Sequence, residues 1–246
     1  GYFQSEKESY LKIAAELGIE ENPAQPGSFC RHPLVYLVEA ADDICYQIMD
    51  LEDACKLGIL SYDQVYELFI AFYNPETDER QLTSINKTLK LVTDKNEQIS
   101  YLRAGVIGKL IQESMSVFTG RLNEIIDGKF TGSLTDALPA AQSAAMKAVK
   151  KISFSQVYAH RSVVEIEIAG YKIIGTILQE FAGAVMNPNS TYNKKLLTLL
   201  PDQYKTNDEQ VYLRTQSVVD FVSGMTDVFA LDLYRKITGI SLPGIR

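Results

Sequence analysis

Residues 31–53 read RHPLVYLVEAADDICYQIMDLED, and this stretch carries the strongest structural signal in the chain. Pro33 suits the first turn of a helix, and Gly58 stands just beyond the last apolar residues, where helices commonly end. Apolar residues recur on nearly every side of such a helix, which is typical of a helix buried in a protein core. The stretch therefore predicts a long, buried α-helix over residues 33–57.

The same helix carries acidic side chains in one sector. At about 100° per residue, Asp42, Tyr46 and Asp50 lie above one another on successive turns. Glu39 and Asp53 lie in the same sector. Because a carboxylate is costly to bury without a partner, we expect this acidic stripe to face Arg or Lys, a metal ion or a polar cavity. The alternative is the solvated face of an ordinary amphipathic helix.

Helical periodicity also dominates the rest of the sequence. Further helices are expected over residues 5–17, 61–73, 96–127, 140–149, 163–185 and 208–237. Residues 163–168 alternate as a strand would, but the 3.6-residue period continues to Phe181 and favours a helix. Runs of β-branched residues flanked by helices are lacking, which disfavours an α/β fold. We therefore predict an all-α chain that forms a single helical domain over residues 1–246.

The composition is that of an ordinary globular protein, with 46% hydrophobic and 22% charged residues. A formal net charge of −7 gives no general attraction to nucleic acid or to anionic membranes, so neither is a predicted partner. Cys30, Cys45 and Cys55 form no C-x-x-C pair, which fits a reducing compartment and inert core packing. Without a signal peptide or an apolar run of roughly 18–20 residues, we expect a cytoplasmic protein.

The predicted long helix resembles the fourth motif of the deoxyguanosine triphosphate triphosphohydrolases, which belong to the HD superfamily. The similarity rests on HPL at residues 32–34, YLVEAADDI at residues 36–44, Tyr46, and DLED at residues 50–53. Four later segments resemble further sequence blocks of the same family, and they occur in the expected order: residues 101–107, 157–161, 220–227 and 234–235. The resemblance implies the C-terminal part of an HD-superfamily helical domain.

The resemblance also implies roles for individual residues. In that family a divalent metal, with Mg²⁺ or Mn²⁺ expected, is held by a His, a consecutive His-Asp pair and a distant Asp, which matches Asp42. The family's pattern makes Tyr46 line the sugar and phosphates, and it makes Asp50 accept the sugar 3′-hydroxyl, a suitable role for a carboxylate. Arg103 is expected either to bind a ligand phosphate or to form an interhelical salt bridge.

Part of the family's metal site is missing from this sequence. Neither His32 nor His160 is followed by Asp, so the His-Asp pair and the earlier His are absent. The family carries those motifs upstream of the helix of Asp42, so we expect a truncated chain that is inactive alone, with its catalytic proton-transfer residue upstream. His32, next to Pro33, is expected to be structural.

The expected activity of the complete protein is hydrolysis of a dNTP, typically dGTP, to the deoxynucleoside and inorganic triphosphate. The resemblance further implies a homo-oligomer. Two alternatives remain open: an HD phosphohydrolase that acts on another nucleotide, and a non-catalytic module for nucleotide sensing or assembly. Release of orthophosphate would indicate the first, and an upstream region without the His and His-Asp motifs would indicate the second.

Overall fold

The computed structural model describes residues 2–22, 25–206 and 208–241, which form eleven α-helices and no β-strand. The all-α prediction is confirmed. The chain divides into two compact units, Gly1–His160 and Arg161–Arg246, and each is described by itself. Two compact units do not test whether the chain folds as one domain, so the single-domain prediction stays a prediction. Among the described helices, none is both long and apolar enough to cross a bilayer.

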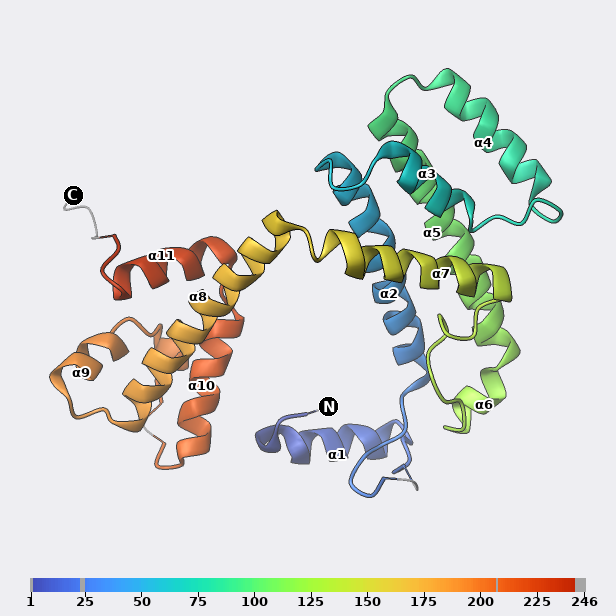
Figure 1. The fold of residues 1–246 in the computed structure, drawn as a ribbon. Helices are drawn as coiled ribbons and strands as arrows, with labels where there is room; N and C mark the ends of the chain where they lie inside the picture. The colour runs from blue at the N-terminus through green and yellow to red at the C-terminus, as the bar shows by residue number, and fades with distance from the viewer. Residues whose placement is uncertain (1, 23–24, 207, 242–246) are drawn as a thin grey trace. The chain divides into compact units, whose positions relative to one another are not determined.

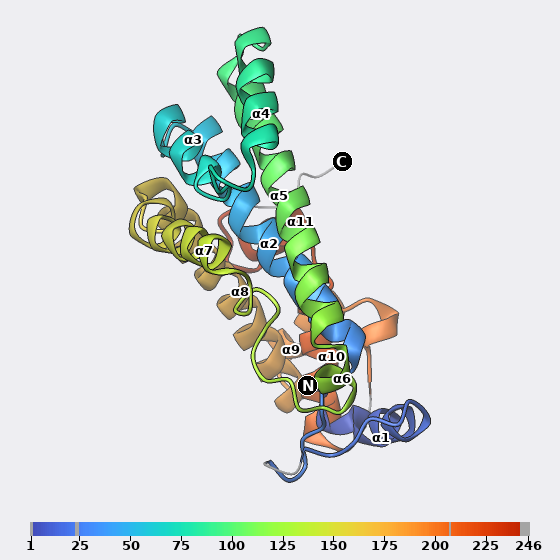
Figure 2. The same ribbon diagram turned by 90° about the vertical axis from the view of Figure 1, so that its right-hand side faces the viewer.

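The first unit is built around two long helices, α2 and α5, which lie side by side and run in opposite directions (Figures 1 and 2). Helices α3 and α7 pack against this pair. The helices of this unit are α1 (Lys7–Glu16), α2 (Pro33–Lys56), α3 (Tyr62–Ile70), α4 (Glu79–Leu91), α5 (Lys95–Gly120), α6 (Leu122–Ile126) and α7 (Ala140–Ile152), followed by a π-helical turn, η2 (Ser153–Val157).

One side of α2 supplies the core of the first unit. Ile44, Ile48 and Leu51 are almost completely buried there, together with Leu102 and Leu110 of α5. Burial of each such side chain stabilises the fold by about 1.5–3 kcal/mol. Contact with α5 therefore fixes which side of α2 is buried, and hence which side is presented outward.

The opposite side of α2 is open. Leu34 is 59% exposed, Val38 is 68% exposed and Met49 is 43% exposed. The expectation that the apolar residues of α2 are buried is therefore wrong on this side, because the neighbouring helices cover only the other side. Cys45 is also exposed on α2, so the expectation that every cysteine is a core residue is wrong at this position.

The structure adds one helix to those expected in the first unit. Helix α4 lies between two helices expected over residues 61–73 and 96–127, where no helix was predicted. Its apolar residues Leu82, Ile85 and Leu89 have helical spacing, but only Ile85 is fully buried. The single helix expected over residues 96–127 is divided at Arg121 into α5 and α6.

The second unit contains α8 (Arg161–Met186), α9 (Thr191–Leu197), a short 3₁₀ turn η3 (Asp202–Tyr204), α10 (Val211–Ser223) and α11 (Asp227–Ile237). Residues 163–168 are helical, as the 3.6-residue period predicted. The C-terminal half of α8 contributes Ile177 and Phe181 to a second core with α9, α10 and α11. The one block expected over residues 208–237 is two helices, and α11 begins where the Thr226 hydroxyl accepts the Phe229 N–H.

Candidate functional site

The candidate site lies on the open side of α2. The helix begins at His32, whose Nδ1 accepts the backbone N–H of Leu34 at 3.2 Å. This contact shows the capping role of a structural histidine. Asp42, Tyr46 and Asp50 follow on successive turns, and the axial rise from Asp42 to Asp50 is about 12 Å. The three predicted residues thus share one face of a single rigid helix.

Asp42 is exposed, and within the described part of the chain it makes no hydrogen bond or ion pair. Its neighbour Asp43 is turned elsewhere and accepts a hydrogen bond from the Thr135 hydroxyl at 3.0 Å. The carboxylate of Asp42 is therefore free to take a ligand from solution.

The residues present do not by themselves make a metal site. Over the described ranges, no group of three or more His, Cys, Asp or Glu side chains is arranged to hold a metal ion. Divalent cations such as Ca²⁺ and Mg²⁺ require about six or more oxygen ligands, several of them from protein or substrate. A lone Asp42 does not meet that need, and its role as a metal ligand stays a prediction.

Asp50 is held by a tyrosine that is distant in sequence. The Tyr158 hydroxyl, just after η2, donates a hydrogen bond to Asp50 Oδ2 at 2.5 Å. Burial, followed by hydrogen bonding to Asp50 and Tyr46, raises the pKa of Tyr158 far above its ordinary value. Tyr158 therefore stays protonated and orients the Asp50 carboxylate, leaving Asp50 Oδ1 available to another donor.

Two further aromatic rings lie against the ring of Tyr158. Tyr46 is 60% exposed, and its ring centroid lies 6.3 Å from that of Tyr158. Phe154 is 62% exposed and meets the Tyr158 ring edge-on, with 5.4 Å between centroids. We call Tyr46, Phe154 and Tyr158 the aromatic cluster. Such rings offer flat apolar surface beside a polar tip, which suits contact with a sugar or a base.

Phe154 and Tyr158 were not predicted as site residues. Residues 157–161 were noted only as resembling a family block. Both aromatic residues owe their position to the π-helical turn η2, a rare element that often occurs at functional sites. The periodicity of a sequence does not indicate such a turn, so the position of these rings beside α2 could not be predicted from the sequence.

Arg103 forms an interhelical salt bridge. Its Nη1 lies 2.9 Å from Oε2 of Glu52, which is only 3% exposed and also contacts Lys56 at 2.9 Å and the hydroxyl of Ser100. Burial alone would raise the pKa of Glu52, but Ser100, Lys56 and Arg103 outweigh it and hold this pKa below its usual value. Of the two roles expected for Arg103 the salt bridge is formed, and contact with a phosphate stays a prediction.

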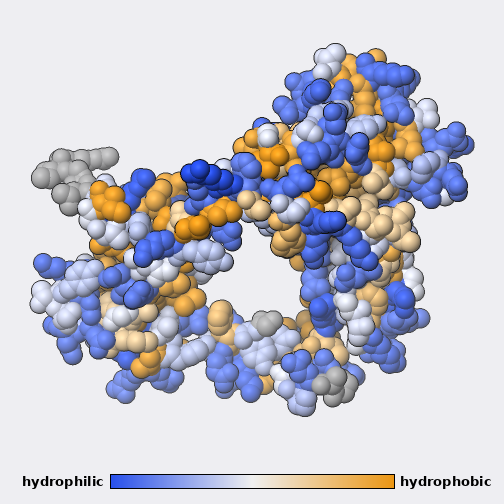
Figure 3. Space-filling view, viewed as in Figure 1, coloured by the Kyte–Doolittle hydropathy of each residue, from blue (hydrophilic) through white to orange (hydrophobic). Residues whose placement is uncertain are grey.

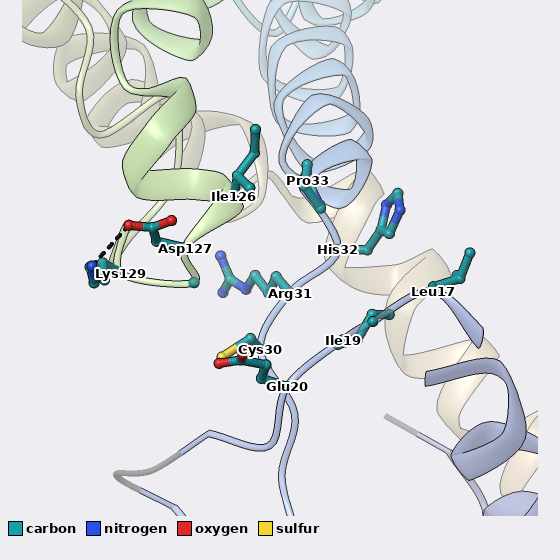
Figure 4. Close-up of a pocket in the computed structure, with 12 residues that line it drawn as sticks. Leu17, Ile19, Glu20, Cys30, Arg31, His32, Pro33, Ile126, Asp127 and Lys129 are labelled. Atoms are coloured by element: carbon teal, nitrogen blue, oxygen red, sulfur yellow. Dashed lines mark hydrogen bonds and ion pairs between the residues drawn. The ribbon is translucent and has the colours of Figure 1, made fainter. Parts of the chain in front are cut away.

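A hollow of about 530 Å³ lies away from these residues, at the start of α2 (Figure 4). Arg31 projects there, but its Nη1 is already engaged by Glu39 at 3.1 Å and by the carbonyl oxygen of Gly132 at 2.9 Å. Lys129 and Asp127 pair with each other at 2.8 Å. Because Arg31, Asp127 and Lys129 are already engaged, this hollow is a weaker candidate than the face of α2.

Comparison with known proteins agrees with the resemblance seen in the sequence. Residues 137–236 match the family model of the phosphohydrolase-associated domain. A deoxyguanosinetriphosphate triphosphohydrolase-like protein from Synechocystis is 32% identical over 244 residues, which cover 98% of this chain and 52% of the relative. A protein of the same name from Listeria monocytogenes is 33% identical over 265 residues, or 98% and 54% of the two chains.

A deoxyguanosinetriphosphate triphosphohydrolase from Yersinia enterocolitica is 25% identical over 280 residues, covering 96% of this chain and 53% of the relative. The chain spans about half the length of the curated relatives it matches. The resemblance inferred from the sequence is confirmed along nearly the whole chain.

Proposed function

We propose that this chain, a homologue of the deoxyguanosinetriphosphate triphosphohydrolase-like proteins, supplies one wall of a dNTP triphosphohydrolase site. The observation that carries the proposal is the row of Asp42, Tyr46 and Asp50 on successive turns of the open side of α2, where Tyr158 orients Asp50. In the complete protein, water would attack the α-phosphorus of a dNTP and its bond to the sugar 5′-oxygen would break. The deoxynucleoside and inorganic triphosphate would leave.

Asp50 is suited to recognise the sugar. Tyr158 occupies Oδ2 of its carboxylate, and Oδ1 is left to accept a hydroxyl hydrogen. A carboxylate held in place before the ligand arrives loses less freedom on binding, which favours a defined sugar position. The aromatic cluster beside it gives the sugar or base an apolar surface. Tyr158 thus acts as a positioning residue for Asp50.

Asp42, two turns before Asp50, is proposed as one ligand of a divalent cation, either Mg²⁺ or Mn²⁺. Its exposed carboxylate has the oxygen chemistry that such hard cations prefer. The remaining ligands would come from residues outside these 246. We therefore expect the isolated chain to bind Mn²⁺ weakly and to hydrolyse no dNTP. Arg103 lies on α5, and its Nε is buried without an acceptor within the described residues, so a phosphate contact from this side chain is also proposed.

We also propose that the chain self-associates. On the first half of α8, Ile168 is 63% exposed and Tyr171 is 75% exposed on one side of the helix, and hydrophobic side chains reach the surface along this helix (Figure 3). If two copies of α8 cross antiparallel near Gly170, Glu167 of each copy meets Lys172 of the other. This self-complementary charge pattern favours a second copy as the partner of the apolar surface.

The role of the Asp50–Tyr158 pair is tested by Tyr158→Phe in the full-length gene product that contains these residues. Loss of the hydroxyl releases the Asp50 carboxylate, so KM for dGTP should rise about tenfold with a smaller change in kcat. Tyr66→Phe, on α3, is the matched control and should leave KM unchanged. An unchanged KM in Tyr158→Phe would contradict the positioning role.

A further inference from the structure

The second unit carries an arginine in a position that normally belongs to the core. Val218, Phe221 and Val222 of α10 are buried against the second core, and Arg214 lies one turn before Val218 on the same side of the helix. Residues spaced by four along a helix share a face. Arg214 is thus half-buried, and its Nε atom lies among packed side chains.

No negative charge meets this guanidinium within the described residues. Arg214 forms no ion pair there, and its Nε is completely buried without an acceptor. The nearby Asp208 uses its Oδ1 to accept the backbone N–H of Gln210 at 2.8 Å. A half-buried cation without a counter-charge is unfavourable, because it has lost part of its water without gaining a partner.

Arg214 lines a hollow of about 340 Å³ in the second unit. One wall of this hollow is apolar and includes Leu197, Leu200 and Tyr204, whose ring packs against Phe221 with 5.5 Å between centroids. The other wall is polar: Lys205 and Thr206 offer donors beside Arg214, and Asp208 adds one carboxylate. A pocket of this size with an apolar body and a few converging polar groups is typical of small-molecule sites.

We propose that this hollow, here called the Arg214 pocket, binds a phosphorylated small molecule with an apolar or aromatic body. The Arg214 guanidinium fits two phosphate oxygens at once. The Thr206 hydroxyl accepts the Asp208 N–H at 3.2 Å, so its own hydrogen is free to donate. Lys205 pairs at 2.7 Å with Asp202, whose side chain is 96% exposed, and a surface pair of this kind is weak enough to exchange for a phosphate.

A phosphate suits the pocket better than a carboxylate does. Arg214, Lys205 and Thr206 together offer more donors than two carboxylate oxygens accept, whereas a phosphate presents three oxygens. The body of the ligand would lie against Leu197, Leu200 and Tyr204. All of these residues belong to the second unit, so the proposal does not depend on the α2 site.

Phenyl phosphate is the probe that matches both walls, and its binding to the 246-residue chain is measurable by isothermal titration calorimetry. Arg214→Met should weaken binding about tenfold or more, since charge-assisted hydrogen bonds are lost. Arg235→Met removes an exposed arginine of α11 in the same unit and should leave binding unchanged. Absence of binding to the unmodified chain, or equal weakening in both variants, would overturn the proposal.

Three further measurements separate this pocket from simpler explanations. Inorganic phosphate should bind at least several-fold more weakly than phenyl phosphate, and equal affinity would refute the role of the apolar wall. Without ligand, Arg214→Met should melt at the same or a higher temperature, because it removes an unpaired, half-buried cation at similar volume. A clearly lower melting temperature would show that Arg214 has a structural partner and would contradict a ligand role. Arg214→Lys, which keeps the charge and loses the bidentate geometry, should fold and bind more weakly.

Discussion

Replacing Glu52 with glutamine tests the buried charge that joins α2 to α5. The Glu52 side chain is 3% exposed and bridges Arg103 and Lys56, each at 2.9 Å. Removing one partner of a fully buried pair costs about 3–5 kcal/mol. The side chains of Arg103 and Lys56 are 30% and 46% exposed, so water compensates part of this loss. We expect Glu52→Gln to lower the free energy of unfolding at pH 7 by about 2 kcal/mol.

The effect of Glu52→Gln should depend on pH in a defined direction. Burial raises the pKa of Glu52, but the hydrogen bond from Ser100 and the charges of Lys56 and Arg103 hold it below the usual 4.5. A carboxyl with a lowered folded-state pKa adds stability that is fully present above its unfolded pKa and is lost as pH falls through the folded value. The stability difference between the two proteins should therefore be largest at pH 7 and should shrink toward pH 3.

Urea unfolding of the 246-residue chain, followed by circular dichroism at pH 7 and pH 3, measures this difference. Glu67→Gln, which neutralises an exposed glutamate on α3 of the same unit, is the matched control and should change little. A loss below about 0.5 kcal/mol at pH 7 would place Glu52→Gln among ordinary surface substitutions and refute the reasoning. A loss that persists undiminished at pH 3 would show that packing, rather than charge, is responsible.

Two further predictions concern a glycine and the open face of α8. Gly128 has φ +66°, and a Cβ there would lie 2.8 Å from Cys30 Sγ. Gly58 has a similar φ of +70°, but a Cβ there would meet nothing within 4 Å. Gly128→Ala should therefore destabilise the chain more than Gly58→Ala does. Thermal melting should show a backbone cost of about 1–2 kcal/mol in both variants and a further loss only in Gly128→Ala, and equal losses would contradict a contact with Cys30. Ile168→Glu should shift the chain toward monomer in light scattering after size exclusion, whereas Leu91→Glu, at the exposed end of α4, should not. An unmodified chain that is monomeric at all concentrations would rule out self-association through α8.

The bounds of α2 were predictable because local chemistry fixes them. Pro33 opens the helix, and Gly58, with φ +70°, allows the chain to leave it in a left-handed conformation. The spacing of about 100° per residue that groups Asp42 with Asp50 also places Glu52 outside their sector of the helix. In the structure, Glu52 is buried against α5. Local periodicity therefore identified which residues share a face.

Other features depend on contacts that periodicity does not encode. Periodicity does not tell how many neighbours cover a helix, which is why the apolar residues Leu34 and Val38 of α2 were expected to be buried and are exposed. The hydrogen bond from Tyr158 to Asp50 joins residues 108 positions apart and depends on a π-helical turn. Helix α4 has a single fully buried residue, Ile85, so its apolar signal is weak. These features arise from tertiary packing.

The most direct test of the proposed function is product analysis of the full-length gene product that contains this chain. The protein would be incubated with dGTP and Mg²⁺ or Mn²⁺ beside an Asp42→Ala variant and beside the 246-residue chain alone. The account predicts that only the unmodified full-length protein releases deoxyguanosine and inorganic triphosphate in equal amounts. Release of orthophosphate instead, or unchanged triphosphate release by Asp42→Ala, would contradict it.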